Sequence, residues 1–170
     1  MSLSAVRFTS FASKYKIRIK QFNALDSHLK NLPGCDLHIL AGDMNFHKET
    51  ENTVYLSKDY QDCWLSSNPD SPGYTFDSHN NKLIHVMFGG MEDRRMRLDR
   101  ILLYDKKQIL KIREMNIIGT KPIYPNRVYR NHFGLYALSL LLRGAIYDSE
   151  RIYSRYLHNS DHYGLSTTFA

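Results

Sequence analysis

Cysteine and long apolar runs are both scarce in this chain, and each scarcity argues against a class of protein. Two cysteines, Cys35 and Cys63, in 170 residues are too few for a disulfide framework and are typical of a reducing compartment. No apolar run approaches the roughly 18 residues of a membrane-spanning helix, and no charged-then-apolar leader opens the sequence. We therefore expect an intracellular protein.

Acidic residues are fewer than basic residues in this chain. There are 17 Asp and Glu against 23 Lys and Arg, which gives a net charge of +6. Such an excess favours a polyanionic partner, nucleic acid first and an anionic membrane surface second. A basic protein with an ordinary solvated surface is the alternative. With 42% hydrophobic residues the chain can bury one core, so we expect a single domain over residues 1–170.

The first part of the chain predicts a helix followed by a buried strand. Apolar residues recur at steps of three and four from Tyr15 to Leu32, which indicates an amphipathic helix that ends at Pro33. The branched apolar run at 37–41 then predicts a strand, and Gly-Asp-Met-Asn follows at 42–45. Residues 1–3 resemble an expression remnant and are left out of the fold prediction. In α/β proteins, ligands bind at the carboxyl ends of strands.

Downstream, alternating apolar and turn-forming stretches predict short elements. We expect a short helix at 60–65, a strand at 74–76 with a turn at 77–81, strands at 96–104 and 109–118, an insertion with one or two helices at 122–159, and a final strand after 160–164. The insertion is rich in tyrosine and arginine. The whole pattern predicts an α/β fold.

Three segments each place a polar group beside a predicted buried strand. They carry Asp43 with Asn45, Asp99, and Asp161 with His162. A buried aspartate is costly unless it is paired, so Asp99 needs a partner, and Arg97 or Arg100 is one candidate. His162 follows an aspartate, and an aspartate that orients an imidazole holds its tautomer or its cationic form.

The order of these motifs resembles the exonuclease/endonuclease/phosphatase superfamily. The motifs are Gly-Asp-Met-Asn at 42–45, Arg-Leu-Asp-Arg at 97–100 and Ser-Asp-His-Tyr-Gly-Leu at 160–165. With Tyr-Thr-Phe-Asp at 74–77, the set is most similar to the 5′-tyrosyl-DNA phosphodiesterases, type 2, over residues 15–170. The resemblance implies the C-terminal half of a four-layer β-sandwich flanked by helices, with a helical insertion near 122–159.

The resemblance also implies a role for each matching residue. Asp43 orients or deprotonates the attacking water, Asn45 holds a non-bridging phosphate oxygen, and His162 donates to the phosphoryl oxygen. Asp99 holds His162 in that state, and Asp161 is an outer metal or water ligand. One Mg²⁺ ion, or Mn²⁺ in its place, polarises the phosphate. In-line phosphoryl transfer depends on such positioning and charge neutralisation.

The implied substrate is a DNA 5′ end with a covalently attached tyrosine, as met in DNA end repair. Phe76 takes the place of a tryptophan and Leu98 that of a larger aromatic residue, so both are candidates for contact with the DNA end, with plain core packing as the alternative. His47 stands where some relatives carry a phosphate-contacting arginine. A nuclear location is implied, with the cytoplasm also open.

The chain departs from the family where the metal is concerned. The family holds magnesium chiefly through a glutamate in its first half, and this sequence has no glutamate before Glu49. A family strand that ends in His-Leu-Glu-Ser aligns with residues 7–10, where the histidine and the glutamate are missing. Glu49 and Glu51 are weaker candidates for a substitute carboxylate.

Three hypotheses follow. In the first, the chain is the C-terminal portion of a tyrosyl-DNA phosphodiesterase, and the metal-binding first half lies elsewhere. In the second, it is a catalytically silent module that binds nucleic acid or protein. In the third, it acts on another phosphodiester, such as an RNA tail or a lipid head group. A half-sandwich leaves one sheet face uncovered, which predicts self-association or coverage by the 122–159 insertion.

Overall fold

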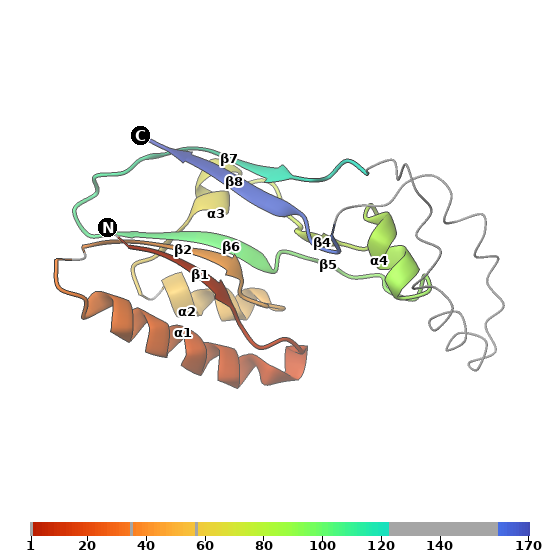
Figure 1. The fold of residues 1–170 in the computed structure, drawn as a ribbon, viewed down its shortest axis with the longest axis horizontal. Helices are drawn as coiled ribbons and strands as arrows, with labels where there is room; N and C mark the ends of the chain where they lie inside the picture. Colours follow the sequence, from red (N-terminus) through yellow and green to blue (C-terminus); the bar gives the residue numbers. More distant parts are fainter. Residues whose placement is uncertain (1, 35, 57, 123–159) are drawn as a thin grey trace.

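A four-stranded sheet forms the centre of the computed structural model, which describes residues 2–34, 36–56, 58–122 and 160–170 (Figure 1). Its strands, in spatial order, are β1 (Ser2–Arg7), β2 (Leu37–Asp43), β6 (Asp99–Asp105) and β3 (Gln61–Asp62). β1 is parallel to β2, whereas β2 and β3 are both antiparallel to β6. The end of β2 and the start of β6 therefore lie at the same end of the sheet.

One face of this sheet is covered by α1 (Tyr15–Lys30), with the short α2 (Thr53–Leu56) beside it (Figure 1). Two single-turn 3-10 helices, η1 (Ala12–Lys14) and η2 (Glu49–Asn52), precede these helices. A buried apolar cluster fills the space between helix and sheet. Its members are Phe8, Phe22, Leu29, Leu40, Met44, Phe46, Tyr60 and Leu102.

The predicted first helix is confirmed, but its buried face is not purely apolar. The buried residues of α1 are Arg18, Phe22, Asp26 and Leu29, which recur at helical spacing, whereas Tyr15 is 42% exposed. The two buried charges are each neutralised nearby. Arg18 is paired with a buried glutamate, and Asp26 with a lysine one turn along the helix. Hydrophobic periodicity alone therefore places the helix correctly but misses half of its inner face.

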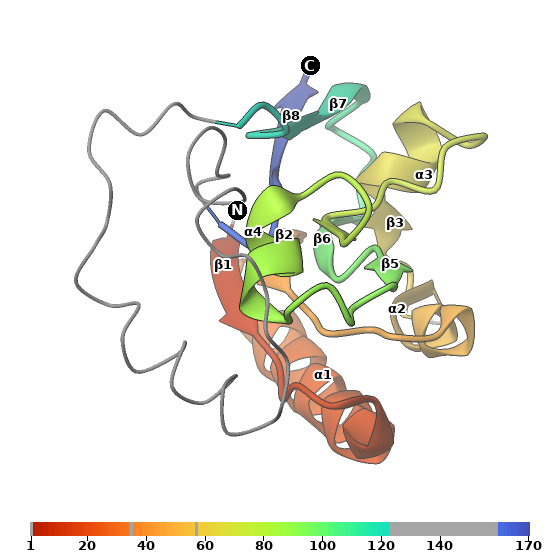
Figure 2. The same ribbon diagram turned by 90° about the vertical axis from the view of Figure 1, so that its right-hand side faces the viewer.

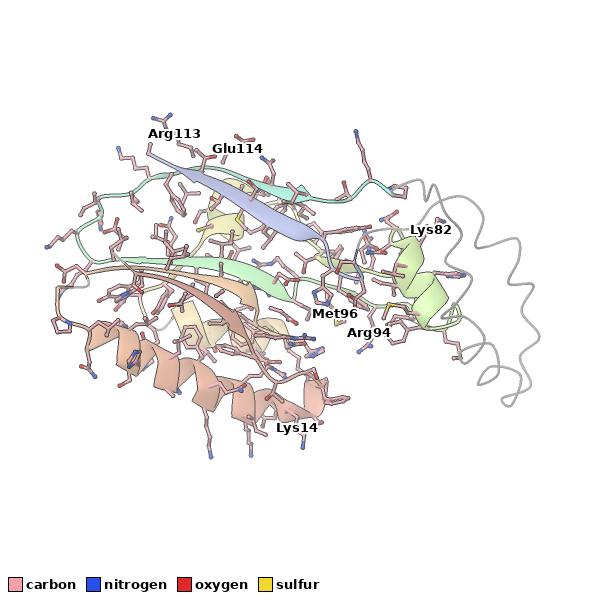
Figure 3. All side chains as sticks on the ribbon, viewed as in Figure 1. Lys14, Lys82, Arg94, Met96, Arg113 and Glu114 are labelled. Carbon is pink, nitrogen blue, oxygen red and sulfur yellow. The ribbon has the colours of Figure 1, made fainter. Side chains whose placement is uncertain are left out.

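The opposite face of the sheet is covered by α3 (Cys63–Ser67) and by an antiparallel pair, β7 (Ile112–Ile118) and β8 (Gly164–Phe169). Figure 2 shows this pair on the side of the sheet away from α1. Arg113 and Glu114 of β7 are exposed and project outward (Figure 3). The second buried cluster lies beneath and consists of Ile39, Cys63, Trp64, Ile101, Leu103 and Met115.

The expectation of an uncovered sheet face is therefore wrong for the two central strands. β2 and β6 carry buried residues toward both layers. The edge strand β1 retains an exposed apolar side chain on the β7–β8 side, where Leu3 is 68% exposed. The opening residues, which the sequence prediction left out, belong to β1 from Ser2 on.

A small unit lies beyond the end of the sheet. It contains the two-residue strands β4 (Phe76–Asp77) and β5 (Arg95–Met96) and the helix α4 (Lys82–Met87) (Figures 1 and 2). Met96 and Arg94 lie at the same end of the molecule as Lys82 of α4 (Figure 3). The predicted continuous strand at 96–104 is in fact β5 and β6, interrupted at residues 97 and 98.

The remaining predictions hold in part. The strand at 37–41 extends to Asp43, and the final strand is confirmed as β8. The helix expected at 60–65 begins only at Cys63, because Asp62 caps it by accepting hydrogen bonds from the N–H groups of Trp64 and Leu65. The predicted helical insertion falls, from residue 123 on, outside the described residues. The α/β fold class is confirmed. Within the described part of the chain, no helix is long and apolar enough to cross a membrane.

Candidate active site

Asp43, Asp99 and His162 converge at one end of the sheet. Asp43 is the last residue of β2 and is the cross-strand partner of Asp99, the first residue of β6. His162 lies just before β8, and its Nδ1 is 2.8 Å from Oδ2 of Asp99. One ligand atom from each of the three side chains lies within 4.8 Å of the others. Three of the four predicted catalytic residues thus form one group.

The partner of the Asp99 carboxylate is His162 rather than Arg97 or Arg100, the candidates that the sequence offered. Arg97 donates to both carboxylate oxygens of Asp62, at 2.9 and 2.7 Å, and Arg100 lies 3.8 Å from the same carboxylate. The Arg100 guanidinium also donates to the backbone carbonyl of Asp99, at 3.2 Å, whereas the Asp99 carboxylate faces His162. Because a carboxylate is an acceptor, the imidazole nitrogen that faces Asp99 carries the hydrogen. The second ring nitrogen of His162 is therefore the one that can donate to a substrate when the ring is protonated.

The two reactive groups have shifted pKa values. Burial raises the pKa of Asp43, and the neighbouring negative charge of Asp99 raises it further, against the hydrogen bond from the Asn45 N–H. Burial alone lowers the pKa of His162, but the hydrogen bond and charge of Asp99 and the charges of Asp43 and Asp161 outweigh it. The pKa of His162 therefore lies above its ordinary value of 6.5. Such shifts are typical of functional groups.

Asn45 is held rigidly beside Asp43. Its backbone adopts a φ of 51°, and its N–H donates to Oδ1 of Asp43 at 2.9 Å. Its side-chain Nδ2 donates to the carbonyl of Phe8, also at 2.9 Å, and the residue is only 5% exposed. One of the two amide N–H bonds is thereby used. The other is the one that a phosphate oxygen can accept from.

Phe76 and Leu98 are buried beside the Asp99–His162 pair, which we call the dyad. They are 5% and 4% exposed and form a buried cluster with Ile84. The ring of Phe76 lies edge-on to the imidazole of His162, with 5.6 Å between the ring centroids. The ring of Phe76 therefore supports His162 directly. The contact of Phe76 and Leu98 with a substrate stays a prediction.

His47 lies in a basic groove that begins directly after Asn45. The groove has a volume of about 780 Å³. Its basic and aromatic lining residues are His47, Lys48, Tyr74, Arg95, Arg97 and Arg100, and Asp70 is its one acidic lining residue among those described. Burial and the charge of Arg18 lower the pKa of His47. Its Nε2 is buried without a hydrogen-bond partner among the described residues.

A divalent cation fits the carboxylates of the site. Asp43 and Asp99 bring two oxygen ligands of like charge close together, an arrangement that a hard cation stabilises. Asp161 lies outside this three-residue group, although its charge acts on His162. Glu51 does not offer a substitute carboxylate, since both of its oxygens accept hydrogen bonds from Arg18, at 2.8 and 2.9 Å.

Three residues beside the site carry no signal that sequence reasoning detected. The guanidinium of Arg7 lies 3.7 Å from the Asp43 carboxylate. The buried Thr75 hydroxyl binds the backbone at Asp99, and the buried Asn81 amide donates to the carbonyl of Ser160 at 2.8 Å. Thr75 lies inside the 74–77 motif, but the target of its hydroxyl is set by tertiary contacts.

Comparison with solved structures gives close matches in fold. D. rerio TDP2, in complex with a single-stranded DNA product, superposes with a TM-score of 0.68 at 22% identity, over 99% of this chain and 55% of that one. C. elegans TDP2 gives 0.62 at 18% identity, over 98% and 41%. An endonuclease/exonuclease/phosphatase family protein from Bacteroides thetaiotaomicron gives 0.59 at 14% identity, over 98% and 48%.

The sequence itself has no such match. No protein-family model and no curated protein matches it. The chain spans about half the length of the solved structures that it resembles. It has the fold of TDP2 and of other endonuclease/exonuclease/phosphatase family proteins over that part of their length.

Proposed function

We propose that the chain carries the phosphate-binding and acid–base side of a metal-dependent phosphodiesterase that hydrolyses a 5′-phosphotyrosyl-DNA linkage. The observation that carries this proposal is the Asp99–His162 dyad, which faces a buried Asp43 across the end of the sheet. The TDP2 fold supports the choice of substrate, because the D. rerio TDP2 structure holds a single-stranded DNA product. The proposed role is DNA end repair in the nucleus.

Asp43 prepares the attacking water. Its carboxylate accepts a hydrogen bond from the Asn45 N–H through Oδ1, which fixes its orientation and leaves Oδ2 to accept a proton from water. Its raised pKa makes it a better proton acceptor than an ordinary aspartate. Water oxygen then bonds to phosphorus while the bond from phosphorus to the tyrosine oxygen breaks.

His162 stabilises the charge that builds on the phosphate. Asp99 binds its Nδ1–H, so the opposite ring nitrogen donates to a non-bridging phosphoryl oxygen. Asn45 donates to a second such oxygen. A tyrosine leaving group has a pKa of about 10, so it departs without a strong general acid.

The carboxylates of Asp43 and Asp99 are the residues that would hold a Mg²⁺ or Mn²⁺ ion, with Asp161 as an outer ligand. A bound divalent cation polarises the phosphate and neutralises part of its charge. Mn²⁺ binding is directly measurable by calorimetry. We expect Asp43→Asn to weaken it, and Asp59→Asn, at an exposed carboxylate outside the group, to leave it unchanged.

The basic groove is the proposed path of the DNA strand. It continues from Asn45 past His47 and Lys48 and is lined by more cations than anions. The phosphates of a single strand are attracted to such a lining, and Tyr74 offers a ring for stacking. His47 offers its Nε2 for a hydrogen bond to the strand.

Hydrolysis of a 5′-phosphotyrosyl oligonucleotide in millimolar Mg²⁺ tests the proposal. We expect release of tyrosine and a loss of about 10²- to 10⁴-fold in rate for Asp43→Asn and for His162→Ala. His28→Ala is the matched control, because His28 is exposed on α1 and lies outside the three-residue group. Activity that survives both active-site substitutions contradicts the proposed roles.

A catalytically silent binding module is the second candidate. The engagement of Glu51 by Arg18 favours it, since this glutamate is then closed to a metal. Under this alternative the oligonucleotide binds but tyrosine is not released at any Mg²⁺ or Mn²⁺ concentration. Strong preference for an RNA tail or a lipid head group in competition with the tyrosyl substrate favours a different phosphodiesterase.

A further inference from the structure

Thr75 contacts the backbone on both sides of the Asp99–His162 dyad. Its side-chain oxygen accepts hydrogen bonds from the N–H groups of Leu98 and Asp99, each at 3.1 Å. Its carbonyl oxygen accepts from the N–H of Tyr163 at 2.7 Å. Thr75 is fully buried.

The hydroxyl explains why the strand breaks before Asp99. The Thr75 N–H donates to the carbonyl of Met96, next to the β4–β5 pair, whereas the N–H groups of Leu98 and Asp99 both donate to the Thr75 hydroxyl. The carbonyl of Leu98 meanwhile accepts from Met44, beside Asp43. The backbone at Asp99 is thus held both by the Thr75 hydroxyl and by its pairing with β2.

The His162 side is fixed from the same segment. The carbonyl of Thr75 holds Tyr163, and the Asn81 amide holds the carbonyl of Ser160, so the two residues that flank Asp161 and His162 are both bound. Asn81, like Thr75, has no exposed surface. Residues 75–81 therefore hold the backbone next to both Asp99 and His162 through hydrogen bonds.

We propose that Thr75 is a positioning residue for the Asp99–His162 dyad: its hydroxyl sets the backbone of Asp99, and its carbonyl sets the loop of His162. It acts through these two residues and does not touch the substrate. The inference rests on the proposed function only for its kinetic consequence. The geometric consequence concerns the hydrogen bond between Asp99 and His162 and is independent of any activity.

Substitution of the hydroxyl separates this role from simple packing. Thr75→Val keeps the shape but leaves the N–H groups of Leu98 and Asp99 without an acceptor, whereas Thr75→Ser keeps the acceptor. Thr75→Cys matches serine closely in shape, but its sulfur is a weak acceptor. Thr167→Val is the matched control, because its hydroxyl binds the Glu114 carbonyl on the β7–β8 pair.

Two measurements on the full chain test the proposal. The first is the downfield proton NMR signal of the His162 Nδ1–H in its hydrogen bond to Asp99. We expect it in the unsubstituted protein, in Thr75→Ser and in the control, and we expect it to be lost or shifted upfield in Thr75→Val and Thr75→Cys. The second is hydrolysis of the tyrosyl oligonucleotide, where kcat should fall about 10- to 100-fold with KM little changed.

The outcomes are distinguishable. A folded Thr75→Val protein that keeps both the signal and kcat overturns the proposal. If that variant does not fold, the comparison of serine with cysteine decides, and an equal signal in the two overturns it. If the unsubstituted chain releases no tyrosine, the proposed function fails, while the NMR comparison still tests whether Thr75 positions Asp99 and His162.

Discussion

At the scale of single residues, the activity of the site depends on the protonation states of Asp43 and His162, whose pKa values are both raised. Asp43 has to be ionised to accept a proton from water, and His162 has to be protonated to donate to the phosphate. The pKa of Asp43 is raised above its ordinary 3.8, and that of His162 is raised above 6.5. Both requirements are met together only at pH values between the two.

The first prediction concerns pH. As the pH rises through the pKa of Asp43 the rate increases, and as it rises through the pKa of His162 the rate falls, so kcat/KM follows a bell with its alkaline limb above pH 6.5. Asp99→Asn removes the negative charge that holds the proton on His162, so it should move the alkaline limb to lower pH. Rate profiles of the two proteins from pH 4 to pH 10 check this, and an unmoved limb contradicts it.

A glycine gives the second prediction. Gly42 has a φ of 141°, and a Cβ there would lie 2.0 Å from the carbonyl oxygen of Val6 in the neighbouring β1. Gly42→Ala should therefore force β1 away from β2 and lower the free energy of unfolding by about 3 kcal/mol or more. Gly119→Ala, also at positive φ but with open space around it, should cost only about 1–2 kcal/mol. Urea denaturation of the two variants compares them, and equal losses contradict a steric cause.

At the scale of elements, a buried ion pair joins three segments around the site. Arg18 of α1 is fully buried and forms a bidentate pair with Glu51 of η2. Its guanidinium also donates to the carbonyl of Phe11 at 2.7 Å, and Glu51 accepts from the His47 N–H at 3.3 Å. The loop after Asn45, the loop before α1 and η2 therefore share one anchor.

The third prediction follows from this anchor. Arg18→Ala leaves a buried carboxylate unpaired and should lower the free energy of unfolding by about 3–5 kcal/mol. Replacing both partners by methionine should recover much of the loss, because no buried charge is then left alone. Arg113→Ala, on the exposed face of β7, is the control and should change stability by less than about 0.5 kcal/mol. Chemical denaturation measures all three, and a small effect of Arg18→Ala contradicts the anchoring role.

At the scale of the whole molecule, the layers and the charge act together. The β7–β8 pair and α1 cover opposite faces of the sheet, which leaves its end, with Asp43, Asp99 and His162, next to the small unit of β4, β5 and α4 (Figures 1 and 2). The net charge of +6 and the cations of the groove favour a polyanion at that end.

The fourth prediction concerns salt. If a DNA strand lies in the groove, the logarithm of its binding constant falls linearly with the logarithm of the salt concentration, by about 0.7 for each phosphate neutralised. Lys48→Ala should weaken DNA binding and reduce that slope by about 0.7, the contribution of one phosphate contact. Lys111→Ala, an exposed lysine that precedes β7 outside the groove, should leave the slope unchanged. Fluorescence anisotropy with a labelled oligonucleotide measures both, and equal slopes contradict this path for the strand.

The sequence by itself determined the elements whose signal is local. Periodicity located α1 and β2, because burial of one helix face or one strand is recorded residue by residue along the chain. The motifs at 42–45, 97–100 and 160–165 named Asp43, Asn45, Asp99 and His162 as candidates. Periodicity did not identify the buried charged residues of α1, because burial of Arg18 depends on Glu51, which lies far along the chain.

Only the tertiary structure decided which of these groups meet. Asp99 and His162 are 63 residues apart, and they are joined because β8 returns to the sheet end where the antiparallel register already pairs Asp43 with Asp99. Arg97 and Arg100 were equally plausible partners by sequence, yet Asp62 binds both. Strand register and the direction of chain return are properties of the packed whole, so no local pattern records them.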